Sequence, residues 1–180
     1  MSSLSQAKAL GGVGSILMVL SIAPIVGPLL MLIGLILVLV AVKDIADAVN
    51  DETIFRNMLI AVILVVVGSL SIAVFAVGSF FTLATMRGSL MSTPAMGMMQ
   101  LALATLIVIA VAWALLLFSA IYLRKSYDAI AKALNISMFS RAALIYLIGV
   151  ALMIIVVGFI IIVVAAILQA VAFFSLPEHL

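Results

Sequence analysis

The chain has 180 residues, of which 69% are hydrophobic and 8% charged, and its mean hydropathy is +1.59. A soluble domain carries about 25% charged residues, and a globule of this size cannot bury so much apolar surface. The composition therefore excludes a soluble enzyme, a nucleic-acid-binding domain and a disordered chain. It predicts an all-α integral membrane protein, because helices satisfy their own backbone hydrogen bonds in lipid.

The first apolar run, residues 10–42, contains no charged residue. As one helix it would be about 50 Å long, whereas the bilayer core is about 30 Å thick. Two prolines and a glycine within residues 24–28 interrupt it. We therefore expect two short segments, residues 10–23 and 28–42, that either cross the membrane twice or form a re-entrant hairpin.

Three longer apolar segments follow, each long enough to span the bilayer with tilt or to project beyond it. They are residues 58–86, 95–123 and 142–174. Two polar connectors, residues 43–56 and 124–141, lie between segments. The pattern predicts a single transmembrane domain over residues 1–180, a polytopic helix bundle of about five hydrophobic segments.

Basic residues are distributed unevenly along the chain. If the chain crosses five times, the N-terminus and both connectors share one side, with seven of the eight Lys and Arg residues, and Arg87 is alone on the other. Cytoplasmic loops collect Lys and Arg. We therefore predict a multi-pass plasma-membrane protein with a cytoplasmic N-terminus and an extracellular C-terminus.

The two connectors resemble each other in sequence. Residues 45–50 read Ile-Ala-Asp-Ala-Val-Asn, and residues 130–135 read Ile-Ala-Lys-Ala-Leu-Asn. Each connector follows a segment that heads inward and precedes one that heads outward. This pattern indicates a same-topology duplication, with the second and third segments repeated as the fourth and fifth.

Each connector also contains helix-ending residues and an apolar stripe. We expect Asn50 and Asn135 to adopt the left-handed conformation that ends a helix, and Thr53 and Ser137 to cap the next helix. The stripes form either a cytosolic docking surface or a contact between the tips of long helices. The candidate docking residues are Ile45, Val49, Phe55, Tyr127, Ile130 and Phe139.

Small residues recur in the apolar segments, where they let helix backbones approach closely. The candidate packing residues are Gly11, Gly12, Gly14, Gly68, Gly78, Gly149 and Gly158. The run from Gly11 to Ser15 lacks the third spaced glycine and the preceding strand of a phosphate-binding loop. It therefore does not indicate nucleotide binding.

The apolar segments contain no ionisable residue, and this argues against proton-coupled transport, voltage sensing and acid–base hydrolysis. The chain has no Cys, and its single His179 lies near the C-terminus, so we expect no metal site and no cofactor. Methionines around residues 86–99 are more typical of interfacial packing than of a Cu(I) site.

These absences favour a non-catalytic protein. We expect a structural or accessory subunit that packs in the lipid bilayer against other membrane proteins or against copies of itself, with no nucleic-acid partner. The alternative is a small oligomeric channel or facilitator for uncharged solutes. Neutral polar side chains that could line such a path are Ser79, Thr82, Gln100 and Thr105.

Three sequence features together resemble a known family. Leu10-Gly11-Gly12-Val13-Gly14 precedes the proline turn, Ile54-Phe55-Arg56-Asn57 begins the third segment, and Phe139 is followed by Ala-Leu-Ile-Tyr-Leu-Ile-Gly at residues 143–149. They are similar to a family of small archaeal multi-pass membrane proteins known only as a domain of unknown function. The resemblance implies an archaeal plasma membrane and implies no activity, substrate or catalytic residue.

Overall fold

The computed structural model describes residues 3–23, 25–86, 94–155 and 157–177, and all regular structure in them is helical. The helices are α1 (Ser3–Leu20), α2 (Gly27–Val49), α3 (Glu52–Met86), α4 (Pro94–Leu134), α5 (Ser137–Ala151) and α6 (Val157–Phe174). The all-α class is confirmed. The expected segments 58–86 and 95–123 lie within α3 and α4, whose remaining turns come from the polar connectors.

The chain divides into two compact units. Unit 1 comprises residues 1–62 and 117–180, and unit 2 comprises residues 63–116. Helices α3 and α4 each contribute to both units. The two units are described separately below.

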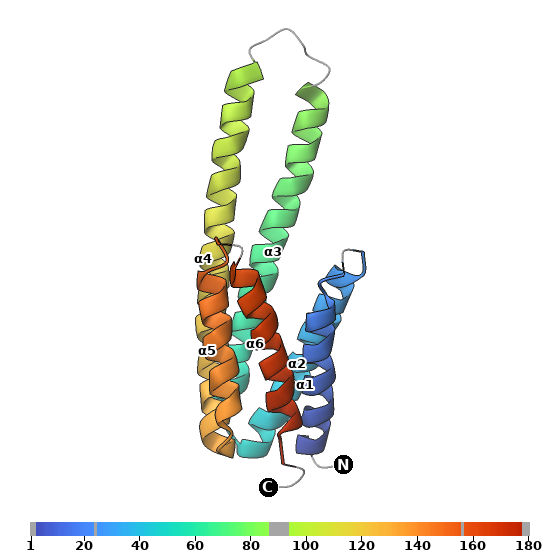
Figure 1. Cartoon of the computed structure of the whole chain (residues 1–180), viewed down its shortest axis with the longest axis vertical. Coiled ribbons are helices and arrows are strands. Elements are labelled where there is room, and N and C mark those ends of the chain that lie inside the picture. The colour runs from blue at the N-terminus through green and yellow to red at the C-terminus, as the bar shows by residue number, and fades with distance from the viewer. Residues whose placement is uncertain (1–2, 24, 87–93, 156, 178–180) are drawn as a thin grey trace. The chain divides into compact units, whose positions relative to one another are not determined.

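One end of unit 1 gathers the polar connectors, residues 43–56 and 124–141, and we call it the charged end. The starts of α1, α3 and α5 and the ends of α2, α4 and α6 all lie there (Figure 1). A buried apolar cluster joins all six helices at this end. Its members include Leu4, Ile45, Ile54, Tyr127, Phe139 and Phe173.

The segment expected as one helix over residues 142–174 is divided into α5 and α6, which form an antiparallel hairpin (Figure 1). Glycines on both sides of the turn permit it. A Cβ on Gly158 would lie 2.4 Å from the carbonyl carbon of Leu152, and a Cβ on Gly149 would lie 2.8 Å from Ile162. The predicted extracellular C-terminus assumed that residues 142–174 cross the membrane once. In the structure, the last residues of α6 instead lie at the end of unit 1 where α1 begins.

Helices α1 and α2 form the short first hairpin that the prolines predicted. The two backbones cross at Gly14 and Gly34. A Cβ added to Gly14 would lie 2.7 Å from the Gly34 carbonyl oxygen, and one added to Gly34 would lie 2.6 Å from the Gly14 oxygen. The close approach therefore depends on the absence of a side chain at both positions.

Unit 2 consists of the apolar parts of α3 and α4. Gly68 on α3 makes ordinary contact with α4, because a Cβ there would lie 3.6 Å from the Leu115 Cβ. In the most apolar stretches of α3 and α4, 11% and 6% of the residues are buried. Most apolar side chains of this unit therefore face outward, as in helices surrounded by lipid.

Within the described residues, four helices are long and apolar enough to cross a membrane: Gly27–Val49, Glu52–Ala84, Gly97–Leu134 and Val157–Phe174. Two shorter apolar helices, Leu4–Leu20 and Ser137–Ala151, pair with the first and last of these.

Candidate functional site

The side chains predicted to form a docking surface lie inside the charged end of unit 1. Ile45, Tyr127, Ile130 and Phe139 have no exposed surface. Val49 and Phe55 are partly buried and pack against the same cluster. These residues form the internal contact between helix ends, the second reading of the sequence pattern. A partner could reach the four buried side chains only by separating the helices.

Three aromatic rings from different helices form the centre of this core. Tyr127 on α4, Phe139 on α5 and Phe173 on α6 meet edge to face, with ring centroids 5.1 to 6.3 Å apart. We call these three residues the aromatic cluster. Such edge contacts stabilise a pair by about 0.5–1.5 kcal/mol beyond the buried area. The cluster thus holds the ends of α4 and α6 and the start of α5 together at the charged end.

The glycine pair of α1 faces two of the C-terminal phenylalanines. A Cβ on Gly11 would lie 2.1 Å from the Phe173 ring, and a Cβ on Gly12 would lie 2.5 Å from the Phe174 ring. The sequence assigned these glycines to packing, but it did not indicate which residues they face. The contact fixes the first helix of the chain against the last.

One hydroxyl in the core lacks a hydrogen-bond partner among the described residues. The Tyr127 Oη is buried and makes no hydrogen bond with any described residue. An unsatisfied buried polar group costs about 1–3 kcal/mol. The sequence placed Tyr127 in the apolar stripe of its connector, and the structure buries its ring completely.

Two serines on α4 bind backbone carbonyls of α3 within unit 1. Ser119 Oγ donates to the Ala61 oxygen at 2.8 Å, and Ser126 Oγ donates to the Ile54 oxygen at 2.8 Å. All four residues are buried. The serines are seven residues apart, as are their acceptors, so the two helices keep one register along this contact. Nothing about Ser126 alone indicated a contact between helices. Its spacing of seven residues from Ser119 could have predicted that both serines lie on one face of α4.

A second buried polar contact joins α1 and α6. Gln169 Nε2 donates to Ser15 Oγ at 3.0 Å, and Ser15 Oγ donates to the Gly11 carbonyl oxygen at 2.7 Å. Hydrogen bonds of this kind between membrane helices contribute roughly 0.6–2 kcal/mol each. They make the pairing of the first and last helices specific.

The two connector turns have the same backbone structure. Asn50 and Asn135 adopt left-handed φ values of 53° and 54°, as predicted. The next amide in each turn donates to the carbonyl five residues earlier, Asp51 to Ala46 and Ile136 to Ala131, at 3.0 Å in both. This is the Schellman arrangement that ends a helix. The likeness is confined to the turns, because α3 continues for 35 residues whereas α5 ends after 15 residues and turns back into α6.

The predicted caps of the following helices are wrong. Asp51 caps α3, because its Oδ1 accepts hydrogen bonds from the Thr53 amide at 3.0 Å and from the Thr53 hydroxyl at 2.6 Å. At α5 the N-cap residue is Ile136, which has no side-chain cap, and Ser137 is the first helical residue. Spacing from the preceding Asn misplaced both caps by one or two residues.

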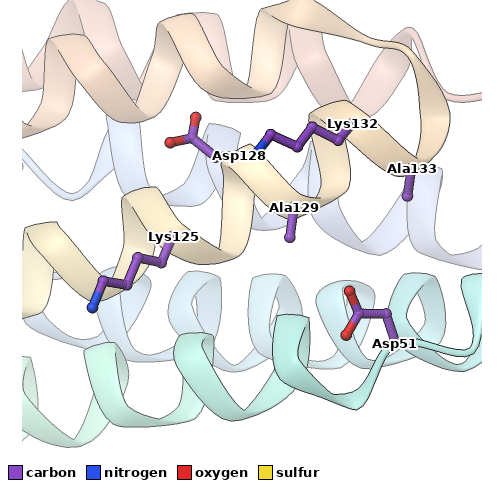
Figure 2. Close-up of a pocket in the computed structure, with 6 residues that line it drawn as sticks. All are labelled: Asp51, Lys125, Asp128, Ala129, Lys132 and Ala133. Carbon is purple, nitrogen blue, oxygen red and sulfur yellow. The ribbon is translucent and has the colours of Figure 1, made fainter.

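A polar groove of about 540 Å³ opens on the surface of the charged end (Figure 2). It is lined by Asp51, Lys125, Asp128, Ala129, Lys132 and Ala133. Asp51 comes from the turn before α3, and the other residues come from α4. The sequence indicated the two connectors separately. It did not indicate that the turn of the first connector lies beside the α4 part of the second.

The charges of the groove are only partly paired. Asp128 accepts a hydrogen bond from Ser140 and lies 3.5 Å from Arg124, one turn earlier on α4. Lys125 Nζ lies 4.9 Å above the Tyr122 ring. The groove therefore presents both ammonium and carboxylate groups at the surface of the charged end. Within the described residues, no three potential metal ligands of the His, Cys, Asp and Glu types come together.

Two of the four polar side chains that could line a channel are bound within their own helices. Thr82 and Thr105 donate to the carbonyls four residues earlier, at 2.9 and 2.7 Å. Ser79 Oγ has no partner among the described residues, and Gln100 is exposed. The packing glycine expected at Gly78 has no described atom within 4 Å of an added Cβ. Arg87, Met91 and His179 lie outside the described residues.

Apolar helices and charges gathered at one end of unit 1 define a multi-pass α-helical membrane protein. A family model described as a protein of unknown function (DUF996) matches residues 30–167, and the chain belongs to this family. An uncharacterized protein of the archaeon Methanocaldococcus jannaschii is 34% identical over 177 residues, 98% of this chain and 95% of that protein. The resemblance expected from the sequence is confirmed. No solved structure matches the chain.

Proposed function

We propose that the chain is a non-catalytic accessory subunit that packs against other proteins of a membrane assembly. The observation that supports this role is that the exposed apolar surface of α3 and α4 is longer than the hydrocarbon core of a bilayer is thick. Along α3, Phe81 lies 25 residues after Arg56, a rise of about 38 Å. Along α4, Met99 lies 25 residues before Arg124, again about 38 Å. The hydrocarbon core is only about 30 Å thick.

The side chains at these far positions are strongly exposed. Phe80 and Phe81 are 70% and 63% exposed, and Met98 and Met99 are 64% and 60% exposed. Lipid alone could cover them only if the helices tilted by about 38°, near the upper end of the 0–40° range. A neighbouring membrane protein would cover the same surface without such a tilt.

We infer that the charged end faces the cytoplasm. Six basic residues lie in the two connectors, and Lys8 lies in the second turn of α1. The positive-inside rule supports a cytoplasmic position for such a surface. The N-terminus then faces the cytoplasm, and the end of α6, which reaches the same end of unit 1, faces it too. This proposal replaces the extracellular C-terminus expected from the sequence.

The accessory role is tested by purification in mild detergent and native electrophoresis. We expect the chain to co-migrate with a defined set of other membrane proteins. Phe80→Ala with Phe81→Ala should weaken this association at least tenfold. Leu70→Ala with Val74→Ala is the matched control, because these side chains are similarly exposed on α3, at 57% and 71%, but lie within the first 20 residues after Arg56. The control should retain the partners.

Two outcomes would contradict the proposal. A stable monomer without partners would exclude an accessory role. A homo-oligomer that releases uncharged solutes from liposomes would instead establish the channel alternative. The self-bonded hydroxyls of Thr82 and Thr105 favour the accessory role over that alternative.

A further inference from the structure

The α5–α6 hairpin has a fixed register within unit 1. Ser140 on α5 donates a hydrogen bond to Asp128 on α4. The backbone at Gly149 lies against Ile162 on α6, since a Cβ on that glycine would lie 3.0 Å from the Ile162 amide nitrogen. The aromatic cluster joins the start of α5 to the end of α6 at the charged end. The turn at residues 152–155 therefore marks the opposite end of the hairpin.

The hairpin is too short to cross a bilayer. Arg141 is exposed and is the last charged residue before the turn. From Arg141 to the end of α5 at Ala151 the helix rises about 15 Å. The register of Gly149 against Ile162 places Ala170 level with Arg141, and from there α6 rises about 20 Å to its first residue. Both rises fall short of the hydrocarbon thickness of about 30 Å.

The remaining length of α6 does not extend this reach. Ala172 and Phe173 are buried in the core of the charged end, beside the connectors. They are outside the part of the hairpin that could enter the lipid. Helix α6 is therefore long enough to span a bilayer, but its last turn belongs to the protein core and only the part before that turn can enter the membrane.

The tip of the hairpin is suited to hydrocarbon. Residues 150–158 contain no polar side chain. The amides of Leu152, Met153, Ile155 and Gly158 donate to carbonyls within the hairpin, at 2.8 to 3.2 Å. Lipid cannot satisfy open backbone groups, so such internal bonding is what a turn in the membrane requires. Ile154 and Ile155 are 72% and 59% exposed, which would be unfavourable in water.

We propose that α5–α6 is a re-entrant hairpin whose tip, Leu152–Ile155, contacts the ends of the lipid acyl chains near the bilayer midplane. It enters from the side of the charged end and returns to it. The exposed side chains of the tip are then surrounded by lipid acyl chains rather than by another protein. The inference concerns unit 1 alone, so it holds whether or not the chain has protein partners.

Single-cysteine labelling in sealed proteoliposomes tests the depth of the tip. The chain has no native Cys, so each variant carries one thiol. The tip variant is Ile154→Cys. Ser137→Cys reports the side of the charged end, and Ser92→Cys, between α3 and α4, reports the other side. A membrane-impermeant maleimide should modify Ile154→Cys at least tenfold more slowly than either reference, from both sides, until detergent is added.

A bimane label on the same cysteine measures its depth directly. Lipids with a nitroxide near the end of the acyl chain should quench the label more strongly than lipids with a nitroxide near the headgroup. Rapid modification from the Ser92 side would show that the hairpin crosses, and rapid modification from the Ser137 side would show that it stays outside. Either result overturns the proposal. Ile155→Cys provides a second tip position if Ile154→Cys does not fold.

Discussion

The crossing of α1 and α2 leaves no space for a methyl group at Gly14 or Gly34, and this gives a quantitative prediction. A Cβ on Gly14 would lie 2.7 Å from the Gly34 oxygen, whereas ordinary contacts begin at 3.4 Å. The obstacle is backbone, so the helices must separate by the difference, about 0.7 Å. A gap of about 0.5–1 Å removes a quarter to a half of each van der Waals contact along the interface.

The expected free-energy change follows from two opposing terms. Overpacking costs about 1–3 kcal/mol, and alanine gains about 0.5–1 kcal/mol over glycine within a helix. Gly14→Ala and Gly34→Ala should therefore each lower the free energy of unfolding by about 1 kcal/mol, within a range of about 0–2.5 kcal/mol. The double variant should lose less than the sum, because one displacement of the helices relieves both contacts.

Reversible unfolding in mixed detergent micelles, followed by far-ultraviolet circular dichroism, measures these differences. Gly78→Ala is the matched control, since no described atom lies within 4 Å of its added Cβ. It should be neutral or more stable by up to about 1 kcal/mol. Equal unfolding midpoints for Gly14→Ala, Gly34→Ala and Gly78→Ala would refute the close crossing.

Three further substitutions test individual groups by the same unfolding assay. Tyr127→Phe removes a buried hydroxyl without a partner among the described residues and should stabilise the protein by about 1 kcal/mol or more; a loss of stability would reveal a hydrogen bond. Asn50→Ala should cost about 1 kcal/mol because alanine disfavours positive φ, while Asn50→Gly should be tolerated; equal stability of the two would contradict the left-handed turn. Ser126→Ala should cost about 0.6–1 kcal/mol by removing the bond to α3, whereas Ser71→Ala, which loses only a bond within its own helix, should have little effect; similar losses in both would argue against the interhelical bond.

Local patterns predicted the features that depend on neighbouring residues. The proline cluster at residues 24–28 indicated the first hairpin, and the two asparagines indicated the connector turns. Both succeed because a turn of this kind is set by the conformational limits of one or two residues. The length rule that divided residues 10–42 could also have divided residues 142–174, since 33 residues again make a helix of about 50 Å. No proline marked that second turn, and the two glycines beside it were interpreted as packing residues.

The candidate site was less predictable, because its chemistry depends on contacts between distant parts of the chain. Ile45, Tyr127 and Phe139 form an apolar stripe whether they face a partner or one another. Only their burial together in one cluster distinguishes a core from a docking surface. In the same way, nothing near Asp51 in the sequence indicates that it shares a groove with Lys125 and Lys132.

The low charge content by itself determined that the chain belongs in a membrane, and the positions of the charged residues determined which parts of it remain near water. Those conclusions follow from the cost of placing charge in hydrocarbon, which depends on each residue alone. The tertiary structure decided what the connectors do and where the chain turns back. At the charged end it packs Tyr127 and Phe139 of the second connector against Phe173 of α6, and at Gly149 and Gly158 it folds an apolar run of span length into a hairpin. Helix pairing depends on contacts between segments far apart in the chain, which composition and periodicity do not contain.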